Sequence, residues 1–108
     1  MTTLKRSQYL ATVLLSLLAL VPGLAQVPQG GVVQSGSAAI SAGTNSLAIT
    51  QSTPNAVINW NSFSIGSGSA VDIRQPGSSS VLLNRVTGSS PSEIYGRLTA
   101  NGQVFVLN

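Results

Sequence analysis

The chain has 108 residues, carries a formal net charge of +3, and contains neither cysteine nor histidine. This length allows one small domain at most. The composition excludes disulfides and any zinc or iron site built on thiolate or imidazole ligands, and we expect no cofactor.

Residues 1–25 have the pattern of a secretory signal peptide. A positive start at residues 5–6 precedes an apolar run over residues 10–21, and small residues stand where a signal peptidase reads, up to Ala25. We therefore expect cleavage between Ala25 and Gln26. The alternative is an uncleaved membrane anchor, but the apolar run is shorter than the ~20 residues that a membrane-spanning helix needs.

Cleavage would remove the two basic residues of the signal peptide and lower the net charge of the chain. Three arginines (Arg74, Arg85 and Arg97) then face two carboxylates (Asp72 and Glu93), which leaves a net charge of +1. This balance does not support a basic nucleic-acid surface. With so few charged side chains, the fold must depend on backbone ladders and stacked apolar residues.

Residues 26–31 are predicted to form a flexible leader. The next stretch, 32–53, is rich in Ser, Gly, Ala and Thr, and its best strand candidates are residues 38–40 and 47–49. A disordered linker is the competing interpretation, because Ser/Gly-rich composition favours disorder. We prefer weak strands, since Val, Ile and Leu recur throughout the segment.

The alternation of apolar residues changes parity after Trp60. Ile58 and Trp60 share one face of a strand, whereas Phe63 and Ile65 fall on the opposite parity. A corner or bulge at residues 61–62 would turn the next strand inward. Trp60 is expected in the core, with a sugar-stacking platform as the alternative.

Short strands are predicted over residues 71–74, 81–83, 94–98 and 104–107, with a loop at 87–91. Their spacing of roughly ten to twelve residues is typical of all-β folds. Two architectures fit this pattern, an antiparallel β-sandwich and a parallel β-helix. Periodicity does not choose between them, but few charges, many Ser and Asn, and very short strands favour the β-helix.

Only Asp72 and Glu93 could supply the carboxylates of a carbohydrate-active enzyme. Asp72 lies beside Arg74 on the outer face of its strand, and a solvated surface pair is the preferred interpretation. The serines at 78–80 have no histidine to activate them and are predicted to form a loop.

Asn84 and Arg85 are expected to be structural: Asn84 would cap a corner, and Arg85 would hydrogen-bond loop carbonyls. The alternative is a contact with a transporter. Four glycines are predicted to adopt positive φ, namely Gly66, Gly68, Gly88 and Gly102.

Residues 57–108 resemble the haemagglutination-activity, or two-partner secretion, domain of filamentous haemagglutinin-like exoproteins. Four motifs carry this resemblance in order: INWNSFSIG from Ile58, VDIRQP from Val71, LNRVTG from Leu83 and GRLTANGQVF from Gly96. A fainter match covers residues 30–55. The family-motif residues are Asn59, Trp60, Phe63, Gly66, Pro76, Asn84, Arg85, Gly88, Gly96, Leu98, Asn101, Gly102 and Phe105.

The resemblance implies a right-handed parallel β-helix, of which residues 32–108 would be the N-terminal coils. It also implies export by the general secretory machinery and recognition in the periplasm by an outer-membrane β-barrel transporter. Since the family's domain is longer, we expect this chain to be a truncated or partial form.

The predicted function is that of a non-enzymatic secretion-targeting module that nucleates β-helix folding at the cell surface. The first alternative is an adhesin that binds glycans or cells directly. The second is a β-helical carbohydrate-active enzyme.

Overall fold

The computed structural model describes residues 26–108, which form eight strands and no helix. The all-β prediction is confirmed for this part of the chain. The strands are β1 (Val32–Ser35), β2 (Ala38–Gly43), β3 (Ser46–Gln51), β4 (Asn55–Trp60), β5 (Ala70–Arg74), β6 (Val81–Val86), β7 (Arg97–Ala100) and β8 (Gln103–Leu107).

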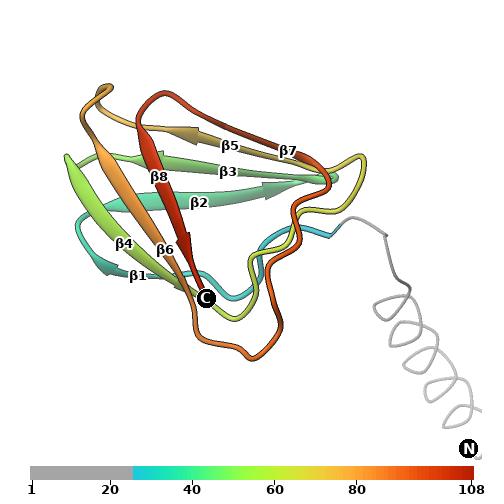
Figure 1. Cartoon of the computed structure of the whole chain (residues 1–108). Helices are drawn as coiled ribbons and strands as arrows, with labels where there is room; N and C mark the ends of the chain where they lie inside the picture. Colours follow the sequence, from blue (N-terminus) through green and yellow to red (C-terminus); the bar gives the residue numbers. More distant parts are fainter. Residues whose placement is uncertain (1–25) are drawn as a thin grey trace, which may run out of the picture.

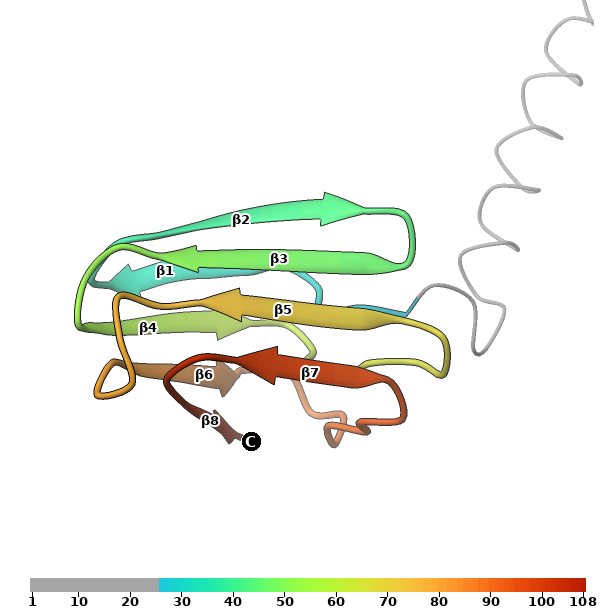
Figure 2. The same ribbon diagram turned by 90° about the horizontal axis from the view of Figure 1, so that it is seen from above.

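The strands build two four-stranded sheets, in the orders β1-β4-β6-β8 and β2-β3-β5-β7 (Figure 1). Within them, β3, β5 and β7 pair in parallel, and so do β4, β6 and β8. From β3 onward the chain alternates between the two sheets and returns each time to the strand beside the previous one, as Figure 2 shows from above. This is the winding of a partial parallel β-helix, and the antiparallel sandwich is excluded. Nearly all such parallel crossover connections are right-handed.

Three successive coils follow from this pairing. Coil 1 consists of β3 and β4, coil 2 of β5 and β6, and coil 3 of β7 and β8. The parallel registers place Ser46 beside Ala70 and Ala70 beside Arg97, so one sheet repeats after 24 and then 27 residues. The corners between strands differ in length, which explains why the sequence shows no fixed repeat.

An antiparallel cap covers the first coil. Strand β1 pairs antiparallel with β4, with a bulge between Val33 and Ser35, and β2 pairs antiparallel with β3 over all six residues. Gly36, at φ 74°, links the two cap strands. Such a cap occupies backbone groups that coil 1 would otherwise leave unpaired at this end of the stack.

Residues 26–31 belong to this capped end, where a flexible leader had been expected. The main-chain N–H of Gln29 donates to Ser62 O at 3.0 Å, and Asn61 N–H donates back to Gln29 O at 2.9 Å. The carbonyl of Gln26 accepts from Gly66 N–H at 2.9 Å. The segment thus pairs with the corner that follows β4. Residues 1–25, for which a signal peptide ending at Ala25 is predicted, lie outside the described residues.

Each coil has a third side, which joins the end of a strand in one sheet to the next strand in the other sheet. This side is irregular, and it corrects two strand predictions. Phe63 and Ile65 are fully buried, as their parity predicted, but they lie in a corner with only isolated bridges. The strand expected at 94–98 begins only at Arg97. The N–H groups of Tyr95 and Gly96 both donate to Ile65 O, and this shared acceptor turns the chain before β7 starts.

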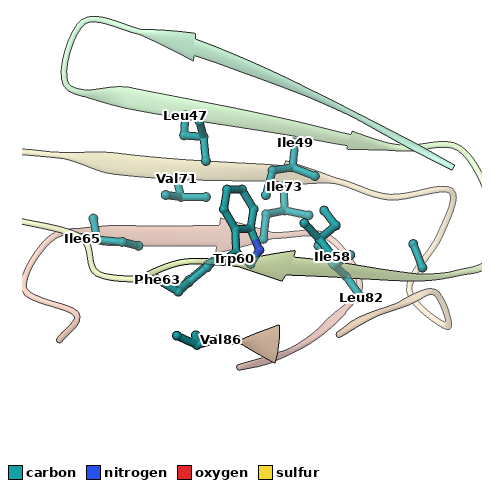
Figure 3. Close-up of a cluster of buried hydrophobic side chains, with 11 residues drawn as sticks. Leu47, Ile49, Ile58, Trp60, Phe63, Ile65, Val71, Ile73, Leu82 and Val86 are labelled. Carbon is teal, nitrogen blue, oxygen red and sulfur yellow. The ribbon is translucent and has the colours of Figure 1, made fainter. Parts of the chain in front are cut away.

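Inward side chains stack in columns along the coils (Figure 3). Leu47 pairs with Val71 and Ile49 with Ile73 across β3 and β5, and all four are buried. Trp60 is 1% exposed and meets the Phe63 ring edge-on, with centroids 5.6 Å apart. The core position predicted for Trp60 is confirmed. Burial of each large aliphatic side chain contributes about 1.5–3 kcal/mol, so these columns provide the main stabilisation.

Candidate functional site

The candidate site is the set of contacts that join one coil to the next, together with the edge at which the described coils stop. Here we call the row formed by Gln51, Gln75 and Asn101 the corner ladder, and the unpaired side of β7 and β8 the open edge. Several family-motif residues lie in or beside these two features, among them Pro76, Leu98, Asn101, Gly102 and Phe105. Their functional roles remain a prediction, while their positions are described below.

Asn84 lies inside the coil stack, so the expected corner cap is wrong. It is the fourth residue of β6, faces inward and is 0% exposed. Its Oδ1 accepts a hydrogen bond from Trp60 Nε1 at 2.9 Å, and its Nδ2 donates to Phe105 O at 3.3 Å. A polar residue in an otherwise apolar strand pattern was mistaken for a turn signal, since sequence alone does not reveal the indole beside it.

The neighbouring motif residues point the other way. Asn59 and Arg85 pair in register on the outer face of β4 and β6, where Arg85 is exposed. The Oδ1 atom of Asn59 is buried without a hydrogen-bond partner among residues 26–108. Pro76 is exposed in the turn after β5. These residues shape the outer surface of the coils.

Close approach of neighbouring atoms, and not positive φ, explains the motif glycines. Of the four predicted to adopt positive φ, only Gly68 does so, at 83°. At Gly88 a Cβ atom would overlap Asn61 O, and at Gly96 it would overlap Ser69 O and Gly66 O. The prediction is therefore wrong for Gly66, Gly88 and Gly102. Most of these positions need glycine because adjacent coils approach closely there.

The corner ladder was missed in the sequence. Gln51 is 3% exposed at the end of β3, and Gln75 is 7% exposed directly after β5. Gln51 Nε2 donates to the carbonyls of Thr53, Pro54 and Val81 at 2.7–3.1 Å. Gln75 Nε2 donates in turn to Gln51 Oε1 at 3.2 Å. Buried amides thus satisfy the corner carbonyls that the tight turns leave without partners.

Coil 3 joins the same ladder through Asn101 and Gly102. Asn101 Oδ1 accepts from Gln75 N–H at 2.7 Å, while its Nδ2 donates to Gln75 O at 2.8 Å. Gly102 N–H donates to Gln75 Oε1 at 2.8 Å. Asn101 and Gly102 therefore form the corner between β7 and β8, which belong to different sheets. The asparagine side chain continues the backbone ladder where the strands have ended.

The open edge exposes apolar side chains on both faces of coil 3. Leu98 and Val104 pack only partly against the core, and Val106 is 37% exposed. On the outer face, Phe105 is 53% and Leu107 56% exposed. In the described part of the chain β7 and β8 are the last strands of their sheets, so one side of each backbone lacks a strand partner. The side chains at this edge are apolar, like those of a protein interior, but they are exposed to solvent.

The two carboxylates lie on different parts of the molecule. Asp72 Oδ2 lies 3.6 Å from Arg74 Nε on the outer face of β5, and Thr99 Oγ1 donates to Asp72 Oδ1 at 2.9 Å. This confirms the predicted surface pair. The shallow depression beside β5 and β7 includes Asp72 but not Glu93.

Glu93 lies in the irregular corner next to Tyr95. Its hydrogen bond and negative charge raise the pKa of the Tyr95 hydroxyl above 10.0. Residues 26–108 contain no cluster of three or more metal-ligating side chains of the His, Cys, Asp or Glu type. They also include no helix with the length and hydropathy required to cross a membrane.

Comparison with known proteins agrees with this geometry. The family model described as TPS secretion domain matches residues 25–108. The crystal structure of the HMW1 secretion domain from Haemophilus influenzae is similar with a TM-score of 0.70 and 37% identity. That similarity covers 75% of this chain and 22% of that chain.

Two curated relatives are also similar. A heme/hemopexin-binding protein of Haemophilus influenzae (strain ATCC 51907 / DSM 11121 / KW20 / Rd) is 46% identical over 82 residues, which are 76% of this chain and 9% of the relative. A second protein of that name from Haemophilus influenzae is 44% identical over 62 residues, or 57% of this chain and 7% of the relative. The chain therefore spans less than a tenth of the length of these relatives.

Proposed function

Because the chain belongs to the TPS secretion domain family and is a secretion-targeting module of a two-partner secretion exoprotein, we propose that its coils also start the folding of a β-helix at the cell surface. One observation carries this proposal: the two ends of the stack differ. The cap strands β1 and β2 close the side of coil 1, whereas coil 3 presents the open edge. Parallel pairing therefore continues from coil 1 to coil 3, whereas the antiparallel cap strands interrupt it on the other side of coil 1.

The open edge favours the addition of another parallel coil. Arriving strands would pair with the unpaired backbone of β7 and β8, and their inward side chains would cover Leu98, Val104 and Val106. In repeat folds each unit is stabilised mainly by the interface with its neighbour. The free energy gained with each added coil, at roughly 25 cal/mol per Å² of buried apolar surface, would make return through the membrane unfavourable.

The partner we propose is an outer-membrane β-barrel transporter of the two-partner secretion type. Delivery to it would follow cleavage after Ala25 and passage of the periplasm, and the product would be secreted or held at the cell surface. The transporter's soluble domains can capture an extended segment by adding it as a strand, which uses backbone hydrogen bonds and needs no charged patch.

Co-expression with the cognate transporter tests this export route. We expect the chain in the culture medium only when the transporter is present, and in the periplasm of a host that lacks it. Immunoblots of medium and periplasm measure the two fractions. Equal release without the transporter would contradict the proposal.

A chimera tests the folding role separately. Residues 26–108 would replace the matching segment of the HMW1 secretion domain, which is longer than this chain. Val106→Asp, at an inward position, should lower the secreted protease-resistant product about tenfold, because a carboxylate cannot be buried unpaired. The control is Gln103→Asp, at an exposed position of the same strand, and it should change the amount of secreted protease-resistant product less than about twofold. Equal losses would contradict the template role.

We propose a non-enzymatic role because Asp72 and Glu93 do not share a pocket. If purified protein cleaved a polysaccharide and the pair Asp72→Asn with Glu93→Gln abolished that cleavage, the proposal would be wrong.

A further inference from the structure

One buried polar side chain interrupts the apolar interior between the coils. Parallel pairing places Asn84 between Ile58 of coil 1 and Val106 of coil 3. Both neighbours in this inward column are aliphatic, yet Asn84 is fully buried. An isosteric leucine would fill the position without the cost of removing an amide from water. The amide therefore needs an explanation beyond packing.

The Asn84 side chain bonds to both adjacent coils. Its Oδ1 accepts from Trp60 Nε1 in coil 1 at 2.9 Å, and its Nδ2 donates to the Phe105 carbonyl of coil 3 at 3.3 Å. The bond to Trp60 joins two side chains, so it depends on which residue of β6 lies above which residue of β4. The bond to a carbonyl is less selective, because backbone carbonyls recur along every strand.

Apolar packing alone distinguishes the possible registers poorly. A slip of β6 by two residues keeps every inward side chain inward, since side chains alternate with a period of two. The inward residues of β6 other than Asn84 are Leu82 and Val86, which are both aliphatic. The corner ladder also ties coil 1 to the start of β6, but Gln51 Nε2 bonds there to the Val81 carbonyl, and a slip could exchange that carbonyl for another one.

A slip in either direction disturbs the native Trp60–Asn84 hydrogen bond, because Leu82 or Val86 would replace Asn84 beside Ile58 and neither can accept the indole proton. In one direction Asn84 moves beside Ala56, and Trp60 Nε1 and the amide are both buried without partners, which is far more costly than weaker packing. In the other direction Asn84 moves beside Trp60, and the indole must leave its native rotamer to keep the bond.

We propose that Asn84 is a register-setting residue, which fixes coil 2 on coil 1 through the indole of Trp60. A single buried asparagine has this role in some coiled coils, at a cost in stability. The inference rests on the proposed function in one respect only, namely that later coils would adopt the register set by coils 1 and 2. Its test reads the register directly and needs no secretion.

Disulfide trapping can measure the register, because the chain contains no cysteine. Val57→Cys with Leu83→Cys forms the native pair, since these residues are partners across β4 and β6. Val57→Cys with Val81→Cys, and Val57→Cys with Arg85→Cys, report the two slipped registers. In the native register those slipped pairs lie beyond the ~7 Å Cα separation that a disulfide spans.

In a glutathione redox buffer we expect the native pair to oxidise, with slipped pairs at about a tenth of its level or less. The double variant Asn84→Leu with Trp60→Phe removes both polar partners together and should raise the slipped disulfides at least about threefold. The control Phe63→Leu also shrinks an aromatic residue of this core but keeps the Trp60–Asn84 bond. It should leave the ratio unchanged.

The proposal would be overturned if the slipped disulfides formed no more in the double variant than with Trp60 and Asn84 intact. It would also be overturned if Phe63→Leu raised them as much as the double variant does. If the double variant forms none of the three disulfides, the same disulfide trapping is carried out with the single variant Trp60→Phe, which removes only the indole donor. Slipped disulfides in that variant support the proposal, and their absence overturns it.

Discussion

At the residue scale, buried amides link the coils where an apolar interior would be expected. Gln51, Gln75 and Asn84 are all nearly inaccessible, and each bonds to atoms of a neighbouring coil or corner. With few charges and no disulfides, these amides are the specific contacts between coils. Each contributes modestly when paired and costs considerably more when its partner is removed.

Replacing Gln75 by leucine tests the corner ladder. The change would leave Gly102 N–H and Gln51 Oε1 without the partners they have in the native corner. We expect the free energy of unfolding, measured by urea denaturation, to fall by about 1–3 kcal/mol. The control Gln34→Leu replaces an exposed glutamine of β1 and should change it by about 0.5 kcal/mol or less. Similar values for both variants would contradict a role for the ladder.

The Tyr95 hydroxyl gives a prediction on pH dependence. The hydrogen bond that the Tyr95 hydroxyl donates to the Glu93 carboxylate, together with the negative charge of Glu93, favours the protonated phenol and raises its pKa above 10.0. An NMR titration of the Tyr95 ring should therefore have its midpoint above this value in the native protein. In Glu93→Gln the midpoint should move down, because the charge is gone. An unchanged midpoint would show that Glu93 does not act on Tyr95.

At the scale of elements, each strand's contribution depends on its place in the stack. Strands β5 and β6 have a coil on either side, whereas β7 and β8 have one on a single side. Leu82 and Val104 show the difference, because they are register partners in the same inward column. Leu82 is 0% exposed, and Val104 is only partly buried.

Truncation of these two residues should therefore have unequal effects. We expect Leu82→Ala to lower the free energy of unfolding by about 2–5 kcal/mol, because it leaves a cavity between coils. Val104→Ala should cost about 1 kcal/mol or less, since its side chain is already partly exposed to water. Urea denaturation of both variants gives the comparison. Equal losses would mean that coil 3 is as well packed as coil 2.

At the scale of the whole molecule, the described stack has antiparallel cap strands at one end and the parallel strands of coil 3 at the other. Local stability should follow this polarity, because openings begin where the fewest contacts must be broken. We expect the amide protons of β5 and β6 to exchange most slowly with D₂O, and those of β7 and β8 at least about tenfold faster. Hydrogen exchange followed by NMR measures this gradient. Uniform protection across the three coils would contradict this polarity.

The sequence by itself determined the local pattern. Alternation at residues 71–74 predicted a half-buried strand, and β5 confirms it, because side-chain parity is a local property of an extended chain. The motifs from Ile58 to Phe105 identified the family for the same reason, since residue order carries them. The cap was less visible: β2 was only partly predicted, and β1 was missed because its four residues, VVQS, show no alternation of apolar and polar side chains.

Only the tertiary structure decided how the strands pair and what the buried amides do. Parallel and antiparallel strands alternate alike, so periodicity could not exclude the sandwich. Gln51 and Gln75 are 24 residues apart and become partners only through the register of β3 and β5. Asn84 suggested a corner until the Trp60 indole was placed beside it. Hydrogen bonds between coils depend on distances in space, which the order of residues along the chain does not specify.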